Sequence, residues 1–167
     1  FTALSILFGG LTVLSHPEAG IHAAVTCILV WIFFGRSLTS LFNSILVGVG
    51  VFLMTSPWWE TVISFHGLTP FLSAVHTGSY GTPLWKALLG LIAGDGVIPI
   101  LALLRLIGLG WGVWRKQYFL LAWVLIPYLV EPRSAPSASF YPMTMLIALA
   151  FAEAIPYYIT RLRKSTL

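Results

Sequence analysis

Two short polar stretches interrupt an otherwise apolar sequence, and each contains residue types that bind ions or move protons. In the first, Glu18 and His22 stand four residues apart, which places them on one face of a helix. In the second, Arg133 follows Glu131 and a proline. A guanidinium there can pair locally with Glu131, or it can hold an anionic lipid phosphate in bidentate fashion. Both interpretations stay open for the second stretch.

The first stretch also has a purely structural interpretation. His16 precedes a proline and Glu18, which is the order typical of a helix start with a cap, a proline in the first turn and an acid near the positive end of the dipole. The spacing to His22 is not that of a zinc-protease motif. We therefore weigh capping alone against an additional role beside a cavity.

Aromatic and acidic residues form a third group. Trp58, Trp59 and Glu60 follow a proline, and the tryptophans suit either headgroup-level anchoring or a stacking wall for a sugar ring. Asp95 lies between two glycines and can cap the following helix. His66, with His16 and His22, completes a loose set of histidines, but no spacing among them supports a metal site. We therefore assign no metal ligands and name no cofactor from the sequence.

Composition defines the class of protein. The chain has 167 residues, of which 58% are hydrophobic and 8% charged, whereas soluble domains carry about 25% charged residues. A water-soluble globule, a disordered chain and a nucleic-acid-binding domain are therefore excluded. The net charge of +4 is better explained by membrane orientation signals. The only cysteine, Cys27, lies in an apolar run and is expected to be a buried thiol.

Six hydrophobic segments predict an all-α polytopic transmembrane bundle, and we treat residues 1–167 as a single membrane domain. Residues 57–96 are too long for a simple connection and contain short apolar runs between prolines and glycines. We expect them to form an exoplasmic loop with short interfacial helices, in which Leu84–Ala93 does not span the membrane. The expected segments are Phe1–Leu14, Ala19–Phe34, Leu38–Met54, Val97–Trp114, Tyr118–Val130 and Ala138–Tyr158.

The distribution of charge then predicts the topology. If the connection containing Arg36 is cytoplasmic, six basic residues lie inside and only Lys86 and Arg133 lie outside, as the positive-inside rule requires. Four of the five acids and all four histidines then lie at or near the outer side. Arg105 and Glu153 remain within spans, and we expect them to form a buried structural pair. The polar site is therefore predicted on the exoplasmic face of a multi-pass protein of the plasma or inner membrane.

Three motifs resemble a known family in order and spacing. They are the stretch from Gly9 to Glu18 (GGLTVLSHPE), the stretch from Thr55 to Phe71 (TSPWW…HG…PF) and the turn from Glu131 to Pro136 (EPRSAP). The pattern resembles the GT-C-type polytopic membrane glycosyltransferases, of the dolichyl-phosphate-mannose protein mannosyltransferase kind.

The resemblance implies transfer of a sugar from a polyprenyl-phosphate donor on the exoplasmic face. It places Arg133 near the donor phosphate and His16 and Glu18 beside the cavity. The other cavity-lining candidates are His22, Trp58, Trp59, Glu60, His66, Asp95 and Glu131.

The family's usual catalytic base is an acid in a loop that would precede Phe1, so we expect this chain to be the C-terminal part of a longer membrane domain. The catalytic residue stays unassigned. The expected partners are membrane lipids, the lipid-linked sugar, and further helices of the same chain or of other subunits. The alternative function is a non-catalytic membrane subunit whose polar turns serve only as helix caps.

Overall fold

The structure is a computed structural model that describes residues 1–77, 85, 89–90, 92 and 99–165. All regular elements within these residues are helical, which confirms the predicted all-α class. The elements are α1 (Thr2–Ser15), α2 (Pro17–Val30), the π-helical turn η1 (Trp31–Gly35), α3 (Leu38–Met54), α4 (Ser56–His66), α5 (Thr69–Thr77), α7 (Pro99–Trp114), α8 (Tyr118–Val130) and α9 (Ala135–Ser165).

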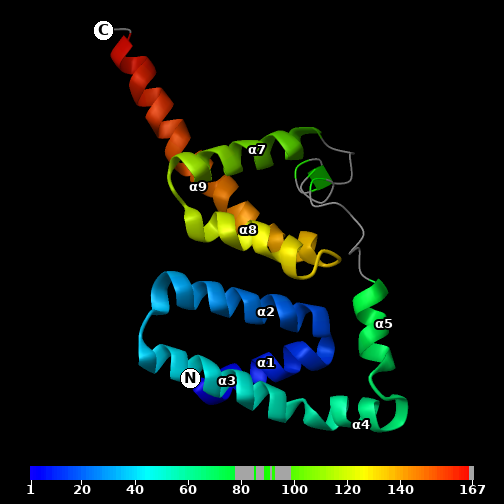
Figure 1. Cartoon of the computed structure of the whole chain (residues 1–167). Coiled ribbons are helices and arrows are strands. Elements are labelled where there is room, and N and C mark those ends of the chain that lie inside the picture. The colour runs from blue at the N-terminus through cyan, green and yellow to red at the C-terminus, as the bar shows by residue number, and fades with distance from the viewer. Residues whose placement is uncertain (78–84, 86–88, 91, 93–98, 166–167) are drawn as a thin grey trace.

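The helices form two groups that meet along one seam (Figure 1). The first group is α1 to α3, in which α1 packs against both α2 and α3. The second group is α7 to α9, in which α9 packs against both α7 and α8. Helix α2 lies against α8 and joins the groups, while α4 and α5 lie to one side of them. The last part of α9 projects beyond the rest of the molecule.

The hydrophobic segments predicted these helices closely. The predicted ranges Leu38–Met54 and Tyr118–Val130 coincide with α3 and α8, and the other predicted segments differ from the observed helices by a few residues at most of their ends. Two described helices are long and apolar enough to cross a membrane, Pro17–Gly35 and Ala135–Glu153. A third span results if α3 and α4, which are bent by 51° at their junction, are counted together.

Within the range 57–96, the described residues form two short helices, α4 and α5, and the placement of this range as an exoplasmic loop stays a prediction. Glycine ends α4, because Gly67 adopts a φ of 63° that side chains rarely tolerate. Most of Leu84–Ala93 and all of Asp95 lie outside the described residues, as does the side chain of His76.

The best-packed region is the group formed by α7, α8 and α9. Its core contains Val124 of α8 and Leu146 of α9, which are both fully buried. The Ser139 hydroxyl, also buried, donates to the Val124 carbonyl oxygen at 2.8 Å and so links α9 to α8. Gly108 allows α7 to approach α9 closely, since a Cβ at this position would lie 2.9 Å from Cγ1 of Ile147 in α9.

Apolar side chains also cover much of the outside of the bundle. Phe42, Phe52 and Leu53 of α3 are each more than half exposed, which suits a helix surface surrounded by lipid rather than water. Cys27 is exposed on α2, so the prediction of a buried thiol is wrong. A long apolar run does not reveal which of its faces packs against protein when lipid can cover the rest.

The close approach of α7 and α9 can be tested with a matched pair of glycines. Gly108→Ala places a methyl group against Ile147, including its backbone nitrogen at 3.0 Å, whereas Gly110→Ala enters open space. We expect Gly108→Ala to lower stability by about 1–3 kcal/mol through overpacking and Gly110→Ala to be neutral or stabilising. Thermal unfolding of both variants in the same detergent measures this, and equal melting temperatures would contradict the packing.

Candidate functional site

The turn between α8 and α9 is organised by one carboxylate, that of Glu131. Proline at position 132 and again at position 136 removes two backbone N–H groups from this region. The remaining donors converge on Glu131, whose Oε1 accepts from the backbone N–H of Arg133 at 3.0 Å. Oε2 accepts from the backbone N–H of Ser134 at 2.7 Å and from its hydroxyl at 2.5 Å. Glu131 is only 6% exposed, so these bonds compensate its burial.

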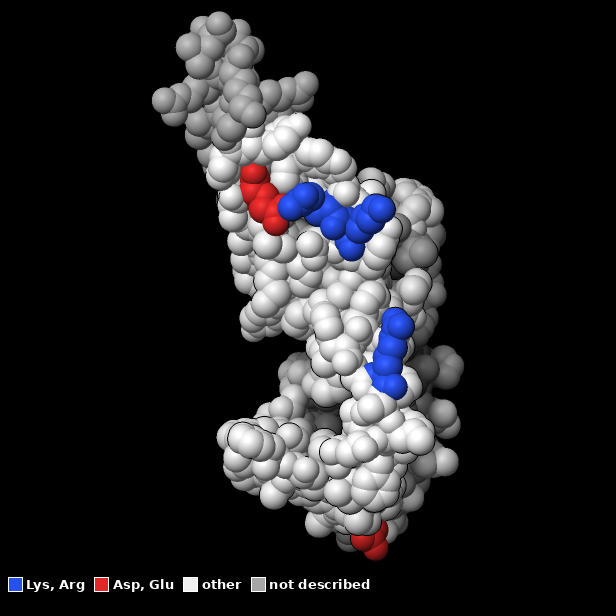
Figure 2. Space-filling view, turned by 90° about the vertical axis from the view of Figure 1, so that its left-hand side faces the viewer, with Lys and Arg blue, Asp and Glu red and all other residues white. Residues whose placement is uncertain are grey.

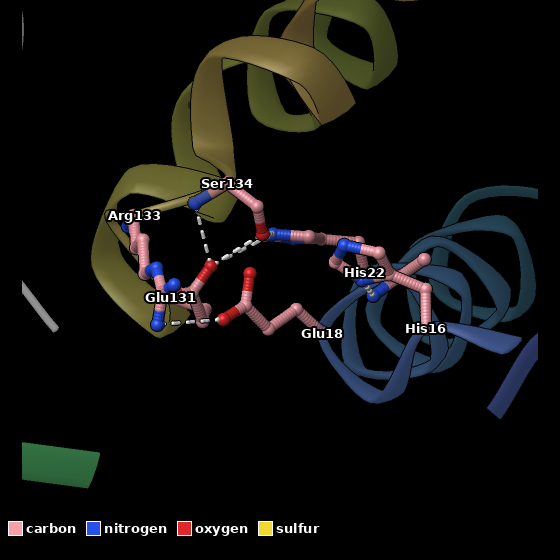
Figure 3. Close-up of polar contacts among 7 residues, drawn as sticks. His16, Glu18, His22, Glu131, Arg133 and Ser134 are labelled. Atoms are coloured by element: carbon pink, nitrogen blue, oxygen red, sulfur yellow. Dashed lines mark hydrogen bonds and ion pairs between the residues drawn. The ribbon is translucent and has the colours of Figure 1, made fainter. Parts of the chain in front are cut away.

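His22 connects α2 to this turn (Figure 3). Its Nε2 lies 2.8 Å from the Ser134 hydroxyl oxygen and 3.4 Å from Oε2 of Glu131. Because the single hydroxyl hydrogen of Ser134 is donated to Glu131, Nε2 of His22 carries a hydrogen and donates it to the Ser134 oxygen. In a neutral ring, Nδ1 is then a bare acceptor.

The same contacts determine the charge of Glu131. Burial raises the pKa of this carboxyl group. The hydrogen bonds from the Ser134 hydroxyl, from the backbone N–H groups of Ser134 and Arg133, and from His22 together lower the pKa by more than burial raises it. The net result is a pKa below the ordinary value of 4.5. Glu131 is therefore ionised at neutral pH.

A second contact crosses the same seam at the surface. Nη1 of Arg133 lies 3.2 Å from Oε1 of Glu18, at the start of α2. Both side chains are accessible, at 54% and 29% exposure. The local pair between the Glu131 and Arg133 side chains, considered from the sequence, is therefore wrong. Glu131 binds the backbone of Arg133, while the guanidinium of Arg133 reaches Glu18 (Figure 3).

The capping interpretation of the first motif is confirmed. His16 is the N-cap of α2, and its Nδ1 accepts from the backbone N–H of Ala19 at 3.4 Å. Proline occupies the first turn together with Glu18. Capping is not the only role of this motif among the described residues, because Glu18 also binds Arg133 and His22 reaches the α8–α9 turn.

A pocket of about 420 Å³ opens beside these contacts, between α2 and the adjoining parts of α8 and α9. Of the predicted lining residues, His16 and His22 border it, and Glu131 lies behind the bordering residue Ser134. The residues that line it are His16, Ala19, His22, Ala23, Thr26, Trp123, Ser134, Ser137, Ala138 and Tyr141.

The other predicted lining residues lie elsewhere. Trp58, Trp59, Glu60 and His66 belong to α4 and do not border this pocket. Trp59 stacks on Phe52 at 4.8 Å between ring centroids and donates to its carbonyl oxygen, which anchors α4 to α3. Trp59 therefore has a packing role within the described chain.

The ion pair that Glu153 forms is not the predicted pair with Arg105. Glu153 accepts from Nε of Arg115 at 2.6 Å and from the indole N–H of Trp111 at 3.1 Å. Glu153 is about one third exposed. Arg105 lies on α7 two to three helical turns before Arg115, where its charge acts on Tyr128. The prediction named the wrong basic partner because hydropathy gives the depth of a residue but not the register between two packed helices.

Basic residues gather at the end of the molecule opposite the site. Arg36 follows η1, and Arg115 and Lys116 follow α7, so the two connections that carry them lie at the same end (Figures 1 and 2). Figure 2 views this end and shows basic side chains on both helix groups. Among the described side chains, three basic residues therefore lie at the end opposite the α8–α9 turn, together with Glu153, and the predicted orientation in the membrane stays a prediction.

Sequence reasoning missed three contributors to the site. Ser134 appeared only as part of a motif, and Trp123 and Tyr141 appeared only as apolar residues within spans. The signal for Ser134 was its position three residues after Glu131, which is the reach of a carboxylate over a turn. No local signal marked Trp123 or Tyr141, since their place at the pocket depends on how α8 and α9 pack.

No group of three or more metal-ligating side chains occurs in the part of the chain that the structure describes. Comparison with known proteins found no matching family model, curated protein or solved structure. The function is therefore argued from the geometry and chemistry of the site.

The ionised Glu131 makes stability depend on pH. Because its pKa is lowered on folding, its contribution is present above the unfolded-state value near 4.5 and is lost as the pH falls through the folded-state pKa. We expect Glu131→Gln to lower stability by about 1.5–3 kcal/mol at neutral pH and to flatten the loss of stability on acidification. Melting temperatures measured across this range test the expectation, with Glu60→Gln on the exposed face of α4 as the control. Parallel curves for wild type and Glu131→Gln would contradict it.

Proposed function

We propose that this chain is part of an integral membrane glycosyltransferase that takes a sugar from a polyprenyl-phosphate donor on the exoplasmic face of the cell membrane. The observation that carries the proposal is the convergence of Arg133, Glu18, His16 and His22 beside one pocket. These residues come from two sequence motifs more than 100 positions apart.

The exposed guanidinium of Arg133 suits the donor phosphate. Arg133 directs one nitrogen to Glu18, and a guanidinium has five N–H donors in a planar fork that matches phosphate oxygens. It lies at a turn outside the membrane-spanning helices, where a lipid-linked phosphate at the headgroup level can approach. The buried carboxylate of Glu131 holds the turn from which Arg133 projects.

The charge distribution supports an exoplasmic site. With the basic end of the bundle in the cytoplasm, as the positive-inside rule predicts, the α8–α9 turn and the start of α2 face the opposite side. Two to three spans of adequate length and the exposed apolar helix faces support a membrane location. The remaining helices expected of such an enzyme would come from further parts of the same chain or from other subunits.

A structural subunit is the second candidate, and one observation favours it. Glu18 neutralises Arg133, and Glu131 is fully hydrogen-bonded within the protein. The polar contacts thus also suffice to hold the two helix groups together. The two candidates differ in whether Arg133 exchanges Glu18 for a lipid phosphate.

Donor binding tests the proposal. We expect the protein in lipid nanodiscs to bind a radiolabelled polyprenyl-phosphate mannose, and Arg133→Ala to weaken binding at least about tenfold, because a charge-assisted bidentate contact is lost. Arg133→Lys is expected to be intermediate, since an ammonium lacks the fork. Arg36→Ala, at the basic end, is the matched control and should bind as wild type does.

Glu18→Gln gives the complementary result. Removing the competing carboxylate is expected to raise donor affinity, because Arg133 is then unpaired before the phosphate arrives. Absence of donor binding by the wild-type protein, or equal binding by the Arg133 and Arg36 variants, would instead favour the structural subunit.

A further inference from the structure

Among the described residues, three cations gather where two connections meet, at the end of the bundle opposite the α8–α9 turn. Arg36 lies between η1 and α3 in the first helix group, whereas Arg115 and Lys116 lie between α7 and α8 in the second. Phe34 and Phe119 hold the two connections side by side, because their rings pack edge to face across the seam with centroids 5.0 Å apart. Arg36 follows this contact by two residues in one group, and Lys116 precedes it by three in the other.

The positive charge at this place is only partly neutralised by the described chain. Glu153 pairs with Arg115, but neither Arg36 nor Lys116 forms an ion pair with an acid of the described residues. Nε of Arg36 donates to the Ile32 carbonyl oxygen at 2.6 Å, which anchors the guanidinium, and the remaining N–H donors are on its two Nη nitrogens. Like charges on adjoining connections repel one another, so an anion between them would be attracted to both helix groups.

The surroundings of the cations favour a lipid as the source of that anion. Phe34 is 71% exposed, Trp114 56% and Tyr118 59%, so large aromatic rings flank the cations at the level where the helices end. Aromatic rings at this level lie among lipid headgroups, and basic residues beside a helix end attract anionic ones. A phospholipid phosphate therefore suits both the charge and the apolar flanks, whereas a free phosphate would use the charge alone.

We infer that the phosphate of an anionic phospholipid binds between Arg36 and Lys116 and joins the two helix groups at this end, as the Glu131 network joins them at the other. Arg115, next to Lys116 in the chain, adds a second guanidinium to the site. The inference does not rest on the proposed function, because these cations lie at the opposite end from Arg133. In the donor-binding test the bulk lipid of the nanodisc saturates this site, so Arg36→Ala still serves there as the control.

Lipid-dependent stability tests the inference. The full chain is purified in dodecyl maltoside, and dioleoyl phosphatidylglycerol, dioleoyl phosphatidylcholine or glycerol phosphate is added. Tryptophan fluorescence then gives the melting temperature, and native mass spectrometry gives the bound lipid. We expect phosphatidylglycerol to be retained and to raise the melting temperature. Phosphatidylcholine, whose headgroup carries a compensating positive charge, and glycerol phosphate, which has no acyl chains, should do neither.

Substitutions then locate the site. Arg36→Gln and Lys116→Gln are each expected to weaken phosphatidylglycerol binding at least about fivefold, since each removes one contact to the phosphate. Lys86→Gln removes an equal charge at a position that lies outside the described residues and is predicted on the outer side, and it should bind as wild type does. Without phosphatidylglycerol, Lys116→Gln should melt no lower than wild type, because it relieves the repulsion between like charges. This comparison separates loss of the lipid from loss of the fold.

Several results would overturn the inference. Phosphatidylglycerol that neither binds nor stabilises the wild type would do so, as would equal stabilisation by phosphatidylcholine. Stabilisation by glycerol phosphate would indicate a site for a free anion, and equal weakening by the Arg36, Lys116 and Lys86 variants would indicate diffuse attraction to net charge. Binding of phosphatidylglycerol as expected by a protein that does not bind polyprenyl-phosphate mannose would overturn the proposed function and leave this lipid site standing.

Discussion

The structure of the polar end depends on the requirement that a buried carboxylate be given hydrogen-bond donors. Glu131 is almost inaccessible, and the prolines around it remove two backbone donors. The available donors are therefore the backbone N–H groups of Arg133 and Ser134, the Ser134 hydroxyl and the ring of His22. Satisfying one charge thus fixes the conformation of the turn, the start of α9, the tautomer of His22 and the contact between the helix groups.

This constraint also separates the chemistry of the two ends of the bundle. At the basic end, the contact between Arg115 and Glu153 is partly exposed and joins two helices of the same group. At the polar end, Glu131 and His22 join helices of different groups, and a pocket that His22 borders lies beside them. Within the described residues, burial, a network across the seam and a cavity coincide at the polar end.

The elements were largely predictable from the sequence, and their contacts were not. Hydropathy runs gave Leu38–Met54 and Tyr118–Val130 as observed, because a run of apolar residues bounded by polar turns has few other solutions in a helical membrane protein. The partner of Glu153 and the exposure of Cys27 depend on helix register and rotation. A uniformly apolar helix carries little periodicity from which to derive either.

The candidate site was predictable where its signal is local. The cap at His16 and the special character of the Glu131–Arg133 turn are written in consecutive residues, and both motifs meet in the structure. The aromatic wall of the pocket arises from the packing of α8 and α9 and therefore had no local signal.

The two polar contacts across the seam differ in how readily they can be exchanged. The pair between Glu18 and Arg133 is accessible to solvent, and such pairs contribute only about 0–1 kcal/mol. In the proposed function, an incoming phosphate would therefore replace Glu18 at little cost. Glu131 is buried among several donors, and breaking that set would leave unpaired polar groups in the interior. The polar end thus combines a fixed part, which holds the helices and orients His22, with an exchangeable part, which is where a charged ligand can enter without disturbing the fold.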